Sequence, residues 1–167
     1  MAQITFKGNP IHTAGDLPRV GDRAPDFTVT KDDLSDTSLK DFKGRRLVLN
    51  IFPSIDTPVC ATSVRKFNEQ ASKLKNTSVL CVSKDLPFAQ KRFCASEGLS
   101  DVINGSEFRN TSFSDAYKVR IVDGPLAGLL SRAVVVVDEQ GKVIHSQQVP
   151  EIAQEPDYAK ALSVLGG

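Results

Sequence analysis

Residues 53–61, PSIDTPVCA, place a cysteine where a run of apolar residues gives way to a helical pattern. Thr57 is a preferred N-cap residue, and Pro58 suits the first helical position because its fixed φ and missing N–H cost nothing there. Cys60 therefore lies in the first turn of the predicted helix. A helix N-terminus carries partial positive charge and free N–H groups, which favour a thiolate.

Strand and helix patterns alternate on both sides of this stretch. RRLVLNIFPS, residues 45–54, precedes a helical pattern over residues 58–75, and TSVLCVSKD, residues 77–85, follows it. Both apolar runs lack alternation, which is typical of strands buried on both faces of a parallel sheet. Further helical patterns cover about residues 87–98 and residues 112–118. This order predicts a βαβ unit.

The two ends of the chain predict antiparallel pairs. ITFKGNPIHTA, residues 4–14, indicates a hairpin around Gly8-Asn9, and APDFTVT, residues 24–30, indicates another strand. RAVVVVDEQGKVIHSQQV, residues 132–149, indicates a second hairpin turning at residues 138–141. EPDYAKALSVL, residues 155–165, closes the chain as a helix.

These patterns together predict an α/β fold of the thioredoxin-like type. It has a mixed central sheet flanked by helices and an extra N-terminal β-hairpin at residues 1–15. No segment is rich enough in Pro, Gly or Ser to act as a linker, and none repeats, so residues 1–167 are expected to form one domain. A chain of 167 residues with 40% hydrophobic content has enough material for its own core.

Charge and cysteine content exclude several classes of function. The 21 Lys and Arg nearly balance the 20 Asp and Glu, which argues against nucleic acid or an anionic membrane as partner. The N-terminus lacks a signal-peptide pattern and the longest apolar run, AVVVV, is too short to span a bilayer, so a soluble cytoplasmic protein is expected. Three cysteines without CxxC spacing disfavour a disulfide framework or a zinc site, and no phosphate-binding glycine motif occurs.

A helix end alone leaves most of a cysteine protonated at neutral pH. It contributes about 0.3–1 kcal/mol, whereas one pKa unit corresponds to about 1.4 kcal/mol and a free thiol titrates at about 8.5. A cation is therefore needed beside Cys60. His12 belongs to the predicted hairpin and His145 to a late strand, so Arg132, directly before AVVVV, is the better candidate. The alternative is a solvated arginine that only starts a strand.

The opening stretch resembles the P-x-x-x-T-x-x-C signature of peroxiredoxins, with Pro53, Thr57 and Cys60 in register. The wider sequence is similar to the bacterial thiol peroxidase branch, the atypical two-cysteine class. That similarity covers nearly the whole chain, including the N-terminal hairpin. The segments that carry it are LNIFPSIDTPVCATSVRKFN, DLPFAQKRFCASEG, FRN and DGPLAGLLSRAVVVVDEQGKVI.

Carried over by position, the resemblance implies a role for each of five residues. Cys60 would be the peroxidatic cysteine and Cys94 the resolving cysteine. Arg132 would bind peroxide and stabilise the thiolate. Thr57 would offer its hydroxyl to the sulfur and the peroxide, and Pro53 would shield the pocket from water.

The same resemblance implies the reaction and the partners. Hydrogen peroxide and organic hydroperoxides would be reduced to water and alcohols through a Cys60 sulfenic acid and an intramolecular Cys60–Cys94 disulfide. Thioredoxin would be the electron donor. Members of this branch are homodimers without a metal or an organic cofactor, so neither is expected here.

Other interpretations of the cysteines stay open at this point. A cysteine hydrolase would pair Cys60 with His145 and would need neither a thiol reductant nor Cys94. A catalytically silent thioredoxin-fold interaction module would use the cysteines only for packing, as the apolar face around Cys60 permits. Without the family pattern, Cys94 is equally well a partly buried helical residue beside Phe93. Cys81, inside VLCVS, is predicted to fill the core.

The spacing of the two cysteines predicts a conformational step. Cys94 follows Pro87 by seven positions, about 10 Å along a helix at about 1.5 Å per residue. If both helices begin at the same edge of the sheet, the Cα atoms of Cys60 and Cys94 lie farther apart than the roughly 7 Å that a disulfide allows. We therefore expect the first turn around Cys60, and part of the Cys94 helix, to unwind before the disulfide forms.

Overall fold

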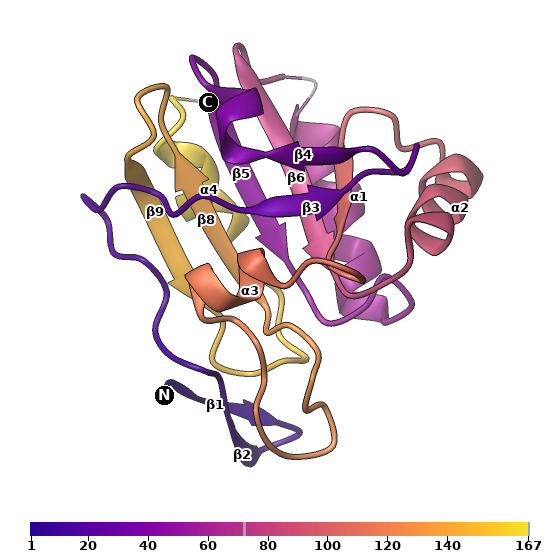
Figure 1. Ribbon diagram of the computed structural model, residues 1–167, viewed down its shortest axis with the longest axis vertical. Coiled ribbons are helices and arrows are strands. Elements are labelled where there is room, and N and C mark those ends of the chain that lie inside the picture. The colour runs from indigo at the N-terminus through magenta and orange to yellow at the C-terminus, as the bar shows by residue number, and fades with distance from the viewer. Residues whose placement is uncertain (72, 167) are drawn as a thin grey trace.

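A seven-stranded mixed sheet forms the centre of the computed structural model, which describes residues 1–71 and 73–166 (Figure 1). The strands β5, β6 and β7 are parallel, and β8 and β9 continue the sheet in antiparallel fashion. The predicted thioredoxin-like mixed sheet is therefore confirmed. In spatial order the strands are β4 (Asp36–Ser38), β3 (Thr28–Thr30), β7 (Ile103–Ser106), β6 (Thr77–Ser83), β5 (Arg46–Ile51), β8 (Ala133–Val137) and β9 (Val143–Gln148).

Helices cover both faces of this sheet. Figure 1 shows α3 in front of the sheet and α1 and α4 behind it, with α2 at the side. Within the described part of the chain, no helix combines the length and the apolar content that crossing a membrane requires. The helices are α1 (Pro58–Ala71), α2 (Pro87–Glu97), α3 (Ser112–Tyr117), α4 (Tyr158–Ser163) and the short 3₁₀ helix η1 (Leu39–Phe42).

Alternate residues of β5 pack into two separate cores. Leu47 and Leu49 lie in the core under α3 together with Phe113, whereas Val48 lies in the core under α1 and α4 together with Phe67. All five of these side chains are buried. Burial on both faces explains why the strand reads as an unbroken apolar run instead of an alternating one.

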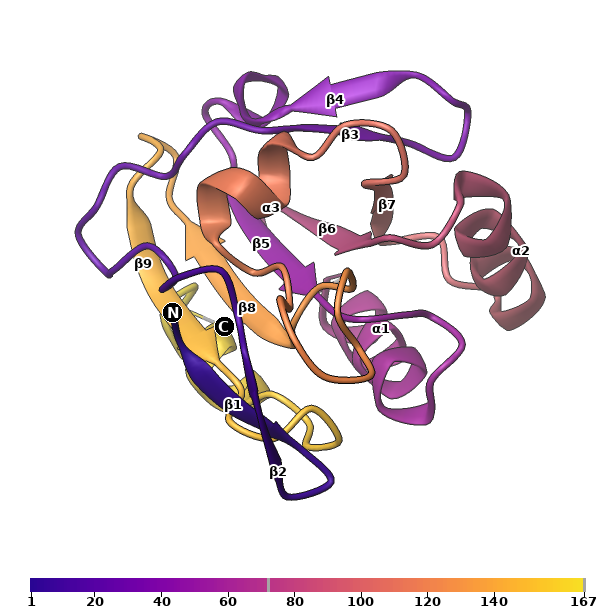
Figure 2. The same cartoon turned by 60° about the horizontal axis from the view of Figure 1, so that its bottom comes forward.

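The predicted N-terminal hairpin is present as β1 (Gln3–Phe6) and β2 (Asn9–His12). Its turn lies at Lys7-Gly8, one position earlier than expected, and both residues have positive φ. Figure 1 shows the hairpin apart from the sheet, and Figure 2 shows it turned towards the viewer. It binds the segment after β9 through its backbone. The N–H of Thr5 donates to Pro150 at 2.8 Å, and the N–H of Ile152 donates to Thr5 at 2.9 Å.

Some expected elements differ in extent. The helix expected over residues 58–75 reaches Ala71, with residue 72 outside the described part of the chain and Lys73 already in a turn. Of residues 24–30 only Thr28–Thr30 pairs as a strand. The strands β4 and β7 were not expected from the sequence.

The strand β7 escapes sequence analysis because its sequence, INGS, contains the Asn-Gly pair typical of turns. Gly105 has another purpose here. A Cβ atom at this position would lie 2.7 Å from Val29 Cγ2, so only glycine lets β3 approach β7 this closely.

Cys81 lies on β6 with none of its surface exposed, in the core under α1. Asn50 Nδ2 lies 3.7 Å from its Sγ atom. Burial raises the pKa of the Cys81 thiol from 9.0 to about 12, because the thiolate would lose its hydration. This environment agrees with the expectation that Cys81 fills the core.

The buried Cys81 thiol predicts a specific alkaline destabilisation. Because the folded pKa exceeds the unfolded one, the contribution of this group to stability is complete below pH 9.0 and is lost as the pH rises towards 12. The loss approaches about 1.4 kcal/mol per pH unit. In urea unfolding, the difference in free energy of unfolding between wild type and Cys81→Ala should therefore shrink with pH above about 9. A difference that stays constant over this range would contradict the assignment.

Candidate active site

Cys60 lies in the first turn of α1, at the carboxyl end of β5, and its surface is fully buried. Thr57 precedes the helix, and its carbonyl accepts the helical hydrogen bond from Ala61 N at 3.0 Å. This places Thr57 at the predicted N-cap position. Its hydroxyl, however, donates to the carbonyl of Ser54 at 2.9 Å instead of capping a helical N–H. The hydroxyl oxygen keeps its lone pairs for an incoming donor. Pro53 is buried beside this loop.

Arg132 directly precedes β8 and reaches Cys60, although it lies 72 positions later in the chain. Its Nη2 donates to Cys60 Sγ at 3.2 Å, and its Nε donates to the carbonyl of Ile152 at 2.6 Å. The main chain of Arg132 is also fixed, because its carbonyl accepts from Val149 N and from Gln148 Nε2, both at 2.9 Å. The guanidinium therefore has a defined position beside the sulfur.

The charge of Arg132 is the strongest electrostatic feature of the site. The residue is only 2% exposed, and among the described residues no carboxylate lies within ion-pair distance of its guanidinium. A buried cation without an anionic partner is costly. A thiolate on Cys60 supplies that partner, so the arrangement favours the anionic sulfur. Arg132 Nη1 is also buried and has no hydrogen-bond partner in the described structure.

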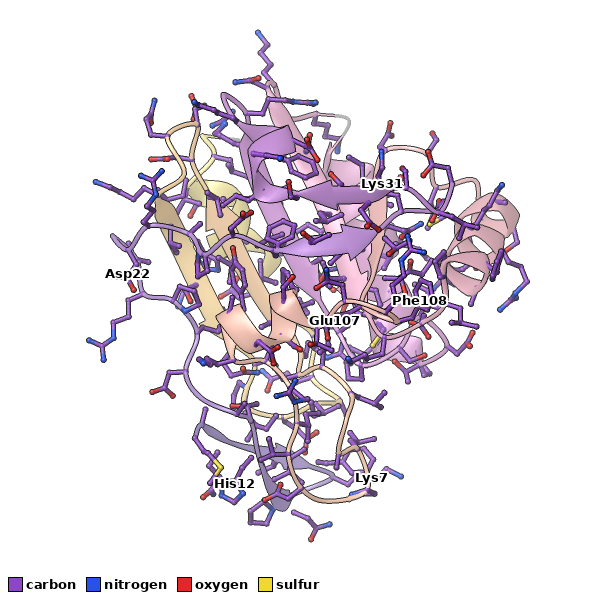
Figure 3. The ribbon with its side chains drawn as sticks, in the orientation of Figure 1. Lys7, His12, Asp22, Lys31, Glu107 and Phe108 are labelled. Carbon is purple, nitrogen blue, oxygen red and sulfur yellow. The ribbon has the colours of Figure 1, made fainter. Side chains whose placement is uncertain are left out.

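Neither histidine takes this position. His12 lies on the hairpin (Figure 3), where its Nδ1 is 2.6 Å from a carboxylate oxygen of Asp123. His145 lies on β9, where burial lowers the pKa of its ring and the charge of Asp157 opposes that effect. The hydrolase interpretation, which pairs His145 with Cys60, has no hydrogen bond in the described structure to support it.

Two polar side chains that the sequence analysis did not single out, those of Ser63 and Asn50, support the helical turn that contains Cys60. Ser63 Oγ donates to the carbonyl of Cys60 at 2.8 Å, and Asn50 Nδ2 donates to Ser63 Oγ at 3.2 Å. All three residues are buried. The sequence does contain a sign of the role of Asn50, because it is the single polar residue inside the apolar run LVLNIF.

Cys94 lies on α2 beside a different strand. Its Sγ is 3.3 Å from Nδ2 of Asn104 on β7, and burial raises the pKa of its thiol. A cavity of about 310 Å³ opens beside it, lined in part by Asp32 and Lys91. Cys94 thus keeps its proton more firmly than a solvated cysteine does.

The sheet order separates the hydrogen-bond partners of the two cysteines. Asn104 belongs to β7 and Arg132 directly precedes β8, with β6 and β5 between them. Three strand spacings of about 4.8 Å make about 14 Å. All three cysteines are free thiols. A Cys60–Cys94 bond therefore requires movement of the segments that carry them.

Comparison with known proteins identifies the family. The redoxin family model matches residues 19–162, most of the chain. The chain belongs to the redoxin family. This redoxin shares 58% identity over 166 residues with the thiol peroxidases of Mycobacterium tuberculosis and Mycobacterium bovis, which covers 99% of this chain and 99% of each relative.

Solved structures agree with this family membership. A peroxiredoxin-like protein from Aquifex aeolicus superposes with a TM-score of 0.92 at 41% identity, covering 98% of this redoxin and 95% of that chain. A thiol peroxidase from Chromobacterium violaceum has a TM-score of 0.90 at 22% identity, with the same coverage, and shows the likeness of the fold.

The full-length identity to thiol peroxidases supports a peroxiredoxin-type peroxidase activity. This redoxin is therefore an oxidoreductase, and the expected enzyme class is confirmed. An interaction module without activity, one of the two alternatives from the sequence, is not compatible with that result.

Removing the guanidinium should weaken the nucleophile. In Arg132→Met the apolar side chain keeps much of the volume but supplies neither the charge nor the hydrogen bond to Cys60. We expect peroxide oxidation of Cys60 to slow by about 10²-fold or more. Alkylation of Cys60 by iodoacetamide at neutral pH should slow as well, measured by mass spectrometry of the labelled peptide.

Arg120→Met is the matched control, because Arg120 pairs with Asp115 at 2.9 Å on the surface. It should oxidise and alkylate at the wild-type rate. An Arg132→Met variant with wild-type rates in both assays would show that the guanidinium does not activate the sulfur.

Proposed function

We propose that this redoxin reduces hydroperoxides with Cys60 as the peroxidatic cysteine and Cys94 as the resolving cysteine. The observation that carries the proposal is the buried guanidinium of Arg132 at 3.2 Å from Cys60 Sγ. Thioredoxin, hydrogen peroxide and organic hydroperoxides are the proposed partners and substrates. The thiol peroxidases that are 58% identical to this chain agree with this assignment.

In the first step, the Cys60 thiolate attacks one oxygen of the peroxide and the O–O bond breaks. The departing oxygen leaves with the bonding electrons and takes a proton, giving water or an alcohol and a Cys60 sulfenic acid. Negative charge develops on that oxygen in the transition state, so a preorganised donor speeds the step. Arg132 Nη1, buried and without a partner, is available as this donor.

Thr57 and Pro53 complete the proposed peroxide site. The Thr57 hydroxyl donates its hydrogen bond to the carbonyl of Ser54, so the hydroxyl oxygen can accept a hydrogen bond from the O–H of a bound peroxide. Pro53 is buried and has no N–H, so it provides an apolar wall in the loop that leads to Cys60. An apolar wall excludes water and strengthens the interaction of the thiolate with Arg132.

In the second step, the Cys94 thiol condenses with the sulfenic acid. The S–S bond forms as the sulfenic oxygen leaves with two protons as water, and a dithiol such as thioredoxin later reduces the disulfide. The interstrand distance of about 14 Å between the partners of the two cysteines supports unwinding of the first turn of α1 and of part of α2.

The decisive experiment measures peroxide consumption with thioredoxin, thioredoxin reductase and NADPH. Cys60→Ser should abolish turnover, because a serine hydroxyl is not ionised at neutral pH. Cys94→Ser should lose thioredoxin-driven turnover but still oxidise Cys60 once per chain. Cys81→Ser is the control and should turn over. Full activity of Cys60→Ser would refute the assignment, and normal turnover of Cys94→Ser would remove only the resolving role.

We further propose a single-domain cytoplasmic protein that forms a homodimer. The hairpin supports one domain, because Ile4 and Ile11 share a small core with Ile121 and Ile152. Reactive thiols recycled by thioredoxin suit the reducing cytoplasm.

Three exposed apolar side chains next to the active-site edge support a second copy as partner. Leu86, Phe88 and Phe108 are 52%, 65% and 42% exposed, and Phe108 is labelled in Figure 3. The side chain of Ser106 joins their segments, since it donates to the carbonyl of Asp85 and accepts from Phe108 N. Large exposed apolar groups that gather in this way mark interaction sites.

A charge in this apolar group should prevent dimer formation. Phe88→Arg is expected to sediment as a monomer of 18.1 kDa in velocity ultracentrifugation, with the wild type at twice that mass. Val20→Arg is the control, because Val20 is 64% exposed on another part of the surface. A Phe88→Arg protein that sediments like the wild type would exclude this face as the interface.

A further inference from the structure

Asp85 lies between β6 and α2, one residue before Leu86, the N-cap residue of α2. It is half-buried, and it stands at the carboxyl edge of the parallel strands, where the loop into α1 also lies. The mechanism described above does not use it. Its contacts nevertheless join the segment before Cys60 to the segment that begins the Cys94 helix.

The carboxylate of Asp85 accepts three hydrogen bonds. Two of them come from the loop before α1, residues 52–57, which we call the Cys60 loop. Oδ1 accepts from Ser54 Oγ at 2.8 Å, and Oδ2 accepts from Ile55 N at 2.7 Å and from Ser83 Oγ at 2.6 Å. Ser54 in turn holds Thr57, whose N–H and hydroxyl both bind its carbonyl. One carboxylate therefore fixes the loop up to the residue that starts α1.

The other side of Asp85 is fixed to α2 and to β7. Its carbonyl accepts from Ser106 Oγ, and the carbonyl of Leu86 accepts the first helical bonds of α2 from Ala89 N and Gln90 N. Movement of the Cys60 loop away from Asp85 thus removes the loop's attachment to the start of α2. The side chain of Asp85 thus holds the loop before α1, while its main chain leads into α2.

The two steps of the proposed reaction need opposite states of this attachment. Attack on peroxide needs the first turn of α1 intact, because only then does Cys60 Sγ lie 3.2 Å from Arg132 Nη2. Condensation with Cys94 needs the turn released, because the partners of the two sulfurs lie about three strands apart. A hydrogen bond to a charged group is stronger than a neutral one. The Asp85 carboxylate therefore favours the state in which the first turn of α1 is intact.

We propose that Asp85 is a positioning residue that sets the balance between the closed arrangement, which attacks peroxide, and the open arrangement, which forms the disulfide. This inference rests on the proposed function. Weakening the Asp85 contacts shifts the population towards the open arrangement. Oxidation of Cys60 then slows while disulfide formation becomes faster.

Asp85→Asn tests this with little change in shape, because the amide keeps one acceptor oxygen but loses the charge. Since the chain has no tryptophan, the two steps are followed by rapid acid quench and mass spectrometry of the thiol, sulfenic and disulfide forms. We expect the first step to slow and the second to accelerate, each by about three- to tenfold. The peroxide concentration that converts half of Cys60 to sulfinic acid should rise accordingly.

Ser54→Ala removes one of the same hydrogen bonds and should shift both rates in the same directions by a smaller factor. Asp138→Asn is the matched control. Asp138 also binds backbone N–H groups of a turn, at Gln140 and Lys142, but at the opposite end of β5. It should leave both rates unchanged.

Opposite changes in the two rates support the inference. Slowing of both steps, acceleration of both, or no change would overturn it, since a residue needed only for folding has no reason to accelerate the second step. The proposed function fails in a different way, by the absence of Cys60 oxidation or of any Cys60–Cys94 disulfide in the wild-type protein.

Discussion

A buried positive charge without a carboxylate partner is the constraint on which the site depends. A buried guanidinium is costly without an opposite charge nearby, and Cys60 Sγ lies 3.2 Å from that of Arg132. The strand order of the sheet brings these two residues together. Its antiparallel part brings Arg132 to the start of β8, where Ala133 pairs with Ile51 at the end of β5, and α1 begins just beyond. The mixed sheet is thus what places the cation beside the helix N-terminus.

The same sheet keeps the second cysteine away from the first. Cys94 is held at β7 by Asn104, and two strands lie between that position and the strand that follows Arg132. The separation leaves the space beside the Cys60 sulfur to the peroxide, because a second thiol in permanent contact would occupy part of that space. In the proposed reaction the separation also has a cost, because the oxidised Cys60 has to move before it can react with Cys94. We propose that contacts such as those of Asp85 set how readily this movement occurs.

Much of the fold and the chemical identity of the site could be predicted from the sequence. The strand runs around β5 and β6, the helix start at Pro58 and the two hairpins all have local signals. What the sequence does not contain is contact between distant segments. The strand β7 was missed because the reason for Gly105 is its closeness to Val29. Asp85 was missed because its partners before α1, Ser54 and Ile55, lie 31 and 30 positions away. The prediction for Thr57 gave the right position, but the direction of its hydroxyl depends on Ser54.

The N-terminal hairpin is linked to the Cys60 site, although it lies apart from the central sheet. Its residue Thr5 accepts from Ile152 N, and the carbonyl of Ile152 accepts from Arg132 Nε. The first strand of the chain thereby holds the backbone that aims the active-site cation. Among related enzymes, substitutions in this hairpin and around Ile152 should accordingly occur together. Removal of the first residues to ease purification would disturb the position of the Arg132 guanidinium and hence the chemistry at Cys60.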